Sequence, residues 1–102
     1  MTYDELVRAA RLRARKTKVN ALDEDIKTYI DFVLSDLERI GVPKSLLLEP
    51  TDPILINAIL TYVRAFYPLD SNHDRWMAAY DRIIVKVKDK VRKWKAEAEA
   101  GT

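Results

Sequence analysis

Apolar residues recur at helical spacing through the first half of the chain. The clearest stripe consists of Ile26, Ile30, Val33, Leu37 and Ile40. Steps of four and three residues keep these side chains on one face of an α-helix, and Phe32 and Leu34 widen that face. Gly41 suits the left-handed position after a helix, and Pro43 prevents its continuation. The pattern predicts an amphipathic helix over residues 23–40.

A second, more apolar stripe follows the dipeptide Asp52-Pro53. Aspartate is a favoured N-cap and proline is favoured at the first helical position. The stripe consists of Ile56, Ile59, Leu60, Val63 and Phe66. Polar interruptions are few, so this helix is expected at the centre of a bundle. It should end at Tyr67, because the residue before Pro68 disfavours helix.

The last stripe is the longest in the chain. It consists of Trp76, Tyr80, Ile83, Val87, Val91 and Trp94. The β-branched run 83–88 alternates like a strand, but the helical stripe continues through it without a turn signal, which favours helix. Ser71 and Asp74 form a capping-type pair at its start. A helix of about 25 residues would be roughly 37 Å long, so its basic end should project, and residues 96–102 should fray.

The N-terminal segment predicts a shorter helix over Tyr3–Ala14, opened by a capping box of Thr2 and Glu5. Its apolar stripe is narrow and is expected to dock weakly. The stripe consists of Leu6, Val7, Ala9, Ala10 and Leu12. Residues 15–20 form a basic linker. Residues 42–52 hold three consecutive leucines, which either fold back over the bundle or meet another chain, with folding back favoured and a short helical turn opened by Ser45.

Together these elements predict an all-α fold: a small antiparallel bundle of about four helices with a long, projecting C-terminal helix. The chain has 102 residues, 48% of them hydrophobic, which suits a single domain over 1–102 with a flexible tail from about 96. There is no cysteine, which excludes disulfides and thiolate metal sites. No apolar run reaches the length of a membrane span, and the first dozen residues lack the apolar core of a signal peptide.

The formal net charge is +2, but its distribution is uneven. Six basic residues and no acid lie between Arg8 and Lys18, and ten acids and four bases lie between Asp23 and Asp74. Seven bases and one acid lie between Arg82 and Lys95. Three interpretations remain open: solvated helix faces, nucleic-acid contact at the ends, and head-to-tail packing of identical subunits.

Candidate partner-binding residues follow from charge and exposure. They are the C-terminal Lys86, Lys90, Lys93, Trp94 and Lys95, the loop residues Leu46, Leu47 and Leu48, and the N-terminal Arg13, Arg15 and Lys16. A tryptophan between two lysines near the chain end is typical of an interface anchor. The alternative for Trp94 is packing against the first helix.

Catalytic and cofactor motifs are not found in the sequence. There is no glycine-rich phosphate loop, no dinucleotide fingerprint and no serine triad pattern. His73 is the single histidine and is expected to have a surface or capping role. We therefore expect no enzyme, no cofactor and no metal.

Three segments resemble one known family. They are Thr2-Tyr3-Asp4-Glu5-Leu6, the entry Asp23-x-x-Ile26-x-x-Tyr29-Ile30, and the run from Pro53 to Tyr67. Their order and the chain length resemble the head–tail connector family of tailed bacteriophages, the small helical adaptor or head-completion proteins. The resemblance spans about residues 2–94 and consists of helix patterns.

The resemblance implies a structural role in the virion, with assembly in the cytoplasm of the bacterial host. It implies a ring of about a dozen subunits beneath the portal protein. Such a ring extends the DNA channel, passes DNA without sequence-specific binding, and docks the next stopper or tail-completion protein. No membrane is implied. The isolated chain is expected to be a monomer or weak oligomer.

The alternative is a small nucleic-acid-binding regulator. A helix-turn-helix requires a turn of 3–4 residues, whereas about a dozen residues separate the helices predicted over 23–40 and 53–67. The second of these helices also has few long polar side chains with which to read bases. The sequence therefore favours the structural role.

Overall fold

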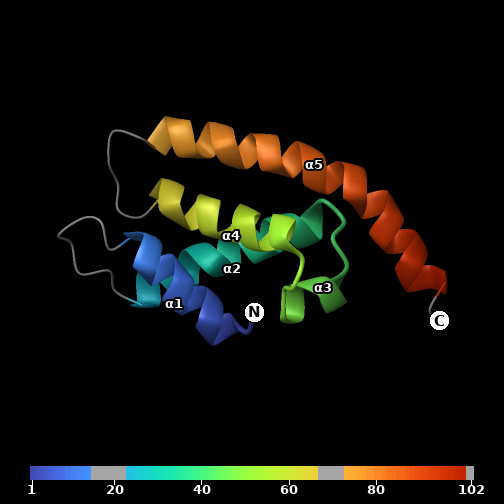
Figure 1. Cartoon of the computed structure of the whole chain (residues 1–102), viewed down its shortest axis with the longest axis horizontal. Helices are drawn as coiled ribbons and strands as arrows, with labels where there is room; N and C mark the ends of the chain where they lie inside the picture. The colour runs from blue at the N-terminus through green and yellow to red at the C-terminus, as the bar shows by residue number, and fades with distance from the viewer. Residues whose placement is uncertain (15–22, 67–72, 101–102) are drawn as a thin grey trace.

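The computed structural model describes residues 1–14, 23–66 and 73–100, and these form five helices with no strand among them (Figure 1). The helices are α1 (Tyr3–Ala14), α2 (Asp23–Arg39), α3 (Lys44–Leu48), α4 (Pro53–Phe66) and α5 (His73–Ala100). The predicted all-α bundle with a long C-terminal helix is confirmed. The run 83–88 is helical, and α5 continues into the segment expected to fray.

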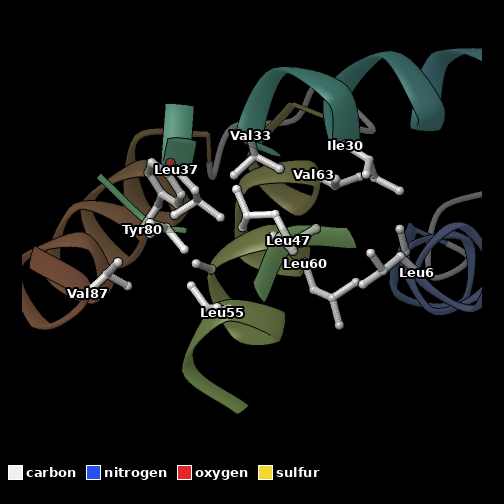
Figure 2. Close-up of a cluster of buried hydrophobic side chains, with 14 of the residues drawn as sticks. Leu6, Ile30, Val33, Leu37, Leu47, Leu55, Leu60, Val63, Tyr80 and Val87 are labelled. Atoms are coloured by element: carbon white, nitrogen blue, oxygen red, sulfur yellow. The ribbon is translucent and has the colours of Figure 1, made fainter. Parts of the chain in front are cut away.

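Helix α4 lies at the centre, as its all-round apolar sequence predicts. It packs against α1, α2 and α5 (Figure 1). Its buried residues are Leu55, Ala58, Ile59, Leu60, Thr61, Val63 and Ala65. Figure 2 shows side chains from all five helices meeting around it, including Leu6 of α1 and Val87 of α5. Nearly every turn of α4 is therefore covered by a neighbour.

Local capping fixes where two helices begin. In the predicted capping box, the Glu5 backbone N–H donates to Thr2 Oγ1 and the Thr2 N–H donates to Glu5 Oε1, each at 3.2 Å. Asp52 Oδ1 accepts from the backbone N–H of Ile54 at 3.0 Å, so the second predicted cap is also confirmed. The capping pair predicted for α5 includes Ser71, which lies outside the described residues.

Helix α2 ends as predicted, with Gly41 in the left-handed region at φ +110°. The Gly41 N–H donates to the Glu38 carbonyl, and the Val42 N–H donates to the Leu37 carbonyl, both at 3.0 Å. These two bonds are the Schellman pattern, which satisfies carbonyls at the helix end. The turn also lies tightly against α5: a Cβ at position 41 would be 2.9 Å from Val91 Cγ1.

The aromatic residues near Pro68 predict a cluster where two helices meet: Tyr62, Phe66, Tyr67, Trp76 and Tyr80. An aromatic cluster does join α4 to α5. The rings of Tyr62 and Phe66 are 4.7 Å apart, and those of Tyr62 and Tyr80 are 5.1 Å apart. His73 adds a link, because its Nδ1–H donates to the Ala65 carbonyl at 2.6 Å while its ring meets Phe66 edge-on. Tyr67, expected in the same cluster, lies outside the described residues.

Two apolar residues assigned to core stripes are exposed. Leu12 is 56% and Phe32 is 57% exposed. Each follows a buried residue, Ala10 or Ile30, by two positions. At about 100° per residue, two positions turn a side chain to the opposite face. Leu6, Val7 and Ala10 of the narrow α1 stripe are fully buried.

Replacing Gly41 by alanine should destabilise the fold. The left-handed backbone alone costs about 1–2 kcal/mol for a residue with a Cβ, and the clash with Val91 adds to this. Urea denaturation should show a lower midpoint with an unchanged slope. Ser45→Ala, an exposed change in the neighbouring helix, should have little effect. A Gly41→Ala midpoint equal to that of the parent would contradict the steric argument.

Candidate interaction surfaces

The surface of the molecule carries shallow recesses and charged faces. Among residues 1–14, 23–66 and 73–100, no three metal-ligating side chains gather into a site. The helices in those ranges include none that is both long and apolar enough to span a bilayer. The features that could engage a partner are therefore sought on the outer faces of α2, α3 and α5.

The C-terminal part of α5 and the α3 region border a common recess at Trp94. Its half-buried ring borders a recess of about 210 Å³ with Pro43, Ser45, Leu46 and Glu97. Trp94 thus packs beside α3, and the alternative of packing against the first helix is wrong. The reason is length: the short α3 lies beneath the part of α5 that extends past α4 (Figure 1).

The lysines around Trp94 are all exposed, and Lys90 also has two nearby partners. Lys90 Nζ lies 3.8 Å from Asp52 Oδ2 and 6.0 Å from the centre of the Trp94 ring. Lys86, Lys93 and Lys95 are exposed. The structure therefore brings Trp94 and Leu46 to one recess, and Lys93 and Lys95 precede and follow Trp94 on α5.

The N-terminal candidate residues for partner binding are Arg13, Arg15 and Lys16. Arg15, Lys16 and the side chain of Arg13 lie outside the described part of the chain. Their proposed contacts stay predictions.

The three leucines of the 46–48 run have different environments. Leu47 is 8% exposed and packs into the core, and Leu46 is partly buried against it. Folding back is thus confirmed for these two, whereas Leu48 is 79% exposed. Leu47 and Leu48 border a groove of about 310 Å³ between α2 and α3, together with Asp31, Leu34, Ser35, Glu38 and Lys44.

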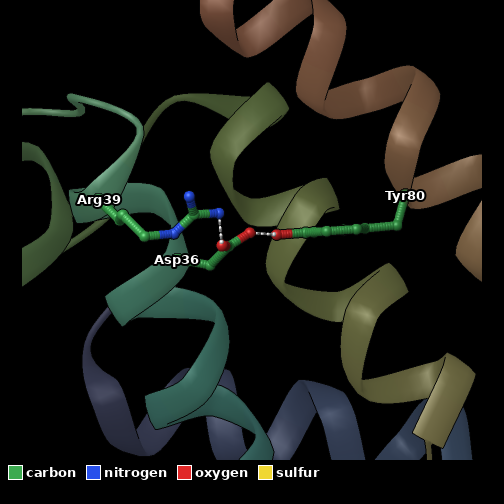
Figure 3. Close-up of polar contacts among 3 residues, drawn as sticks. All are labelled: Asp36, Arg39 and Tyr80. Atoms are coloured by element: carbon green, nitrogen blue, oxygen red, sulfur yellow. Dashed lines mark hydrogen bonds and ion pairs between the residues drawn. The ribbon is translucent and has the colours of Figure 1, made fainter.

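A polar bridge between α2 and α5 was not predicted from the sequence. Figure 3 shows Asp36 accepting from both sides: Tyr80 Oη donates to Asp36 Oδ2 at 2.8 Å, and Arg39 Nη2 donates to Asp36 Oδ1 at 2.6 Å. The bridge lines a shallow recess of about 470 Å³ together with exposed Phe32. Asp36 and Tyr80 are 44 residues apart, so their hydrogen bond depends on how the helices pack and no local sequence motif predicts it.

The bridge shifts the proton affinity of both groups. Burial by itself would raise the pKa of Asp36, but the hydrogen bonds from Arg39 and Tyr80 outweigh it and lower that pKa below the usual 3.8. Burial, followed by the hydrogen bond to Asp36, raises the pKa of Tyr80 far above 10.0. Tyr80 therefore remains a neutral donor and Asp36 a charged acceptor over the whole neutral range.

A second tyrosine joins α1 to α2 in the same way. Tyr3 Oη donates to Asp31 Oδ1 at 2.9 Å. Burial and this bond raise the pKa of Tyr3 to about 12. The carboxylate of Asp31 is thus fixed at the edge of the α2–α3 groove.

Comparison of the chain with known family models, curated proteins and solved structures finds no match.

Removing the Tyr80 hydroxyl should destabilise the protein in a pH-dependent way. Tyr80→Phe loses a hydrogen bond to a charged, partly exposed carboxylate, a loss of about 1–2 kcal/mol at pH 7. Because the folded-state pKa of Asp36 is lowered, its stabilisation is present above pH 3.8 and is lost as the pH falls through the folded value. Urea denaturation at pH 7 and pH 2.5 should therefore show a smaller difference at the lower pH.

Tyr29→Phe is the matched control. The Tyr29 ring stacks on Phe66 with centroids 5.4 Å apart, and ring stacking does not require the hydroxyl. Its stability should stay near that of the parent at both pH values. An equal loss for Tyr80→Phe at pH 7 and pH 2.5 would show that the charged carboxylate is not the partner that matters.

Proposed function

We propose that this chain is a structural head-completion adaptor of a tailed bacteriophage. In this role, copies form a ring beneath the portal protein, extend the DNA channel and dock the next stopper or tail-completion protein. The ring has about a dozen subunits, as the resemblance to the connector family implies. The protein resides in the virion after assembly in the host cytoplasm, and it acts without catalysis or cofactor.

The observation that carries the proposal is the C-terminal end of α5. There, the half-buried Trp94 ring lies beside Leu46, flanked by the exposed Lys93 and Lys95. A partly desolvated aromatic side chain within a polar rim is typical of a protein–protein anchor. We assign this end to the portal, because it combines an anchor with cations that can be matched by a complementary partner surface.

The shape and charge distribution also support the proposal. The principal extents are 48 × 26 × 18 Å, so the molecule is elongated and has two distinct ends. A chain with basic termini and an acidic middle can contact a neighbour through unlike faces, as a cyclic ring requires. DNA then passes through the ring without base-specific contacts.

The second candidate is a nucleic-acid-binding regulator, favoured by the exposed cations of α5. Base reading by α4 is incompatible with the fold, because seven of its residues are buried in the core and a recognition helix must expose its face to the groove. α5 could still contact phosphates. Salt-dependent gel shift with duplex DNA distinguishes this candidate from the adaptor.

The adaptor role predicts a complex with the purified portal ring encoded by the same phage genome. Electron microscopy of the mixture should show a second ring, with the portal's axial symmetry, on the portal surface that faces away from the capsid. Lys93→Glu should weaken this complex at least about tenfold without lowering the denaturation midpoint, since Lys93 is exposed.

Arg8→Glu provides the matched control. It makes the same charge change at an exposed position of α1, outside the face of α5 that carries Lys93. Binding should remain near that of the parent. A portal ring that stays bare with the parent protein, while duplex DNA is shifted at physiological salt, would favour the regulator over the adaptor.

A further inference from the structure

A straight row of carboxylates follows the outer face of α2. Glu24, Asp31 and Glu38 are exposed and spaced seven residues apart. Seven residues are close to two helical turns, so the three side chains lie along nearly one line, about 10.5 Å from one to the next. Asp31 Oδ1 also accepts a hydrogen bond from Tyr3 of α1, whereas Asp36, on another face of α2, is engaged by Tyr80.

The acidic row borders the apolar groove between α2 and α3. Asp31 and Glu38 form its rim, and Leu34 and Leu48 form its walls. Glu38 lies 3.7 Å from Lys44, but both side chains are more than half exposed, so this pair exchanges readily with other cations. The surface thus presents a line of negative charge directly beside exposed leucine.

The outer face of α5 has the complementary pattern. At 100° per residue, Arg82, Lys86 and Lys93 lie within about 40° of one another around the helix, and all three are exposed. Val85 lies beside this row and is 61% exposed. In the described part of the chain, neither Arg82 nor Lys86 forms an ion pair within 4 Å. This surface carries three cations beside an exposed aliphatic side chain, and one acid, Asp89, lies between Lys86 and Lys93 along the helix.

We propose that the outer face of α5 in one copy docks into the α2–α3 groove of a second copy. Val85 then packs on Leu34 and Leu48, while Arg82 and Lys86 face the carboxylates of the acidic row. A second copy is the occupant that fits, because the charges are opposite, the Lys86–Lys93 step repeats the seven-residue period of the acidic row, and both rows have an apolar neighbour. This inference rests on the proposed ring and names the contact between its subunits.

The two faces cannot meet within one molecule. Both α2 and α5 pack against α4 (Figure 1), and the charged row of each helix is exposed on a different face from its buried residues. Each copy therefore uses one face for the preceding neighbour and the other for the next. A head-to-tail contact of this kind closes into a ring or extends into a filament.

Zero-length carbodiimide crosslinking of mixed ¹⁴N- and ¹⁵N-labelled protein tests the contact directly. The reagent joins a carboxylate to a lysine amine in contact with it, and mixed-isotope peptides identify links between different molecules. We expect such links from Glu38 or Asp31 to Lys86 or Lys93, decreasing as salt is raised. Mixed-isotope links that are absent, or that are spread evenly over all surface lysines, would overturn the proposal.

Charge exchange gives a second, independent test. One variant reverses the acidic row (Glu24→Lys with Glu38→Lys), and another reverses the α5 row (Arg82→Glu with Lys86→Glu). Each alone presents like charges at every contact and should self-associate at least tenfold less in sedimentation velocity. Their equimolar mixture restores opposite charges at both contacts and should associate like the parent.

A control variant with the same net charge as the acidic-row variant tests whether net charge alone explains the rescue. Asp25→Lys with Glu49→Lys adds the same charge at exposed acids outside the row, and it should not rescue the α5-row variant. Rescue by this control, or no rescue by the acidic-row variant, would overturn the proposal. If the rescue succeeds but the parent never binds the portal ring, the proposed contact between copies is supported and the adaptor role is overturned. If the parent binds the portal ring but the rescue fails, the adaptor role is supported and the proposed contact is overturned.

Discussion

The structure depends on covering one helix that is apolar almost all round. α4 has apolar residues on nearly every face, so it is stable only where other helices exclude water from every side. Three amphipathic helices meet this requirement, and Leu6, Ile30 and Val87 show α1, α2 and α5 each directing an apolar side chain into the core (Figure 2). Because the apolar faces of those helices pack on α4, their solvent-facing sides carry the charged residues. The separation of charge on the surface is thus a consequence of how the core is built.

The difference in length between α4 and α5 creates a second requirement. α4 has 14 residues and α5 has 28, so about 21 Å of α5 has no partner in α4. The turn at Gly41 and the short α3 fill part of this gap, since Val91 lies against Gly41 and Trp94 lies beside Leu46. A residue without a Cβ is needed there for two reasons, the positive φ and the close approach of α5. The position of the Trp94 end therefore follows from the turn after α2.

The sequence predicted the parts of the fold that depend on local chemistry. The capping box at Thr2, the cap at Asp52 and the left-handed Gly41 each need only neighbouring residues, and each was placed correctly. The predictions were wrong where neighbouring apolar residues of one helix differ in whether another helix covers them. Phe32 is apolar and close to a stripe, but whether it is covered depends on which helix lies beside it, and none does. Leu48 differs from Leu47 for the same reason. The Asp36–Tyr80 bond could not be predicted, because it requires the relative placement of two helices.

The candidate surfaces were likewise only partly predictable from the sequence. The concentration of lysine around Trp94 is visible in the sequence, but its proximity to Leu46 depends on α3 folding under α5. The seven-residue spacing of Glu24, Asp31 and Glu38 is equally visible, yet it gains meaning only once α2 is known to turn that line away from the core. A charged row on a covered face would have to be paired internally at a desolvation cost. On an outward face the same row stays solvated until a partner arrives, so its contribution is to orientation and specificity more than to the stability of the single chain.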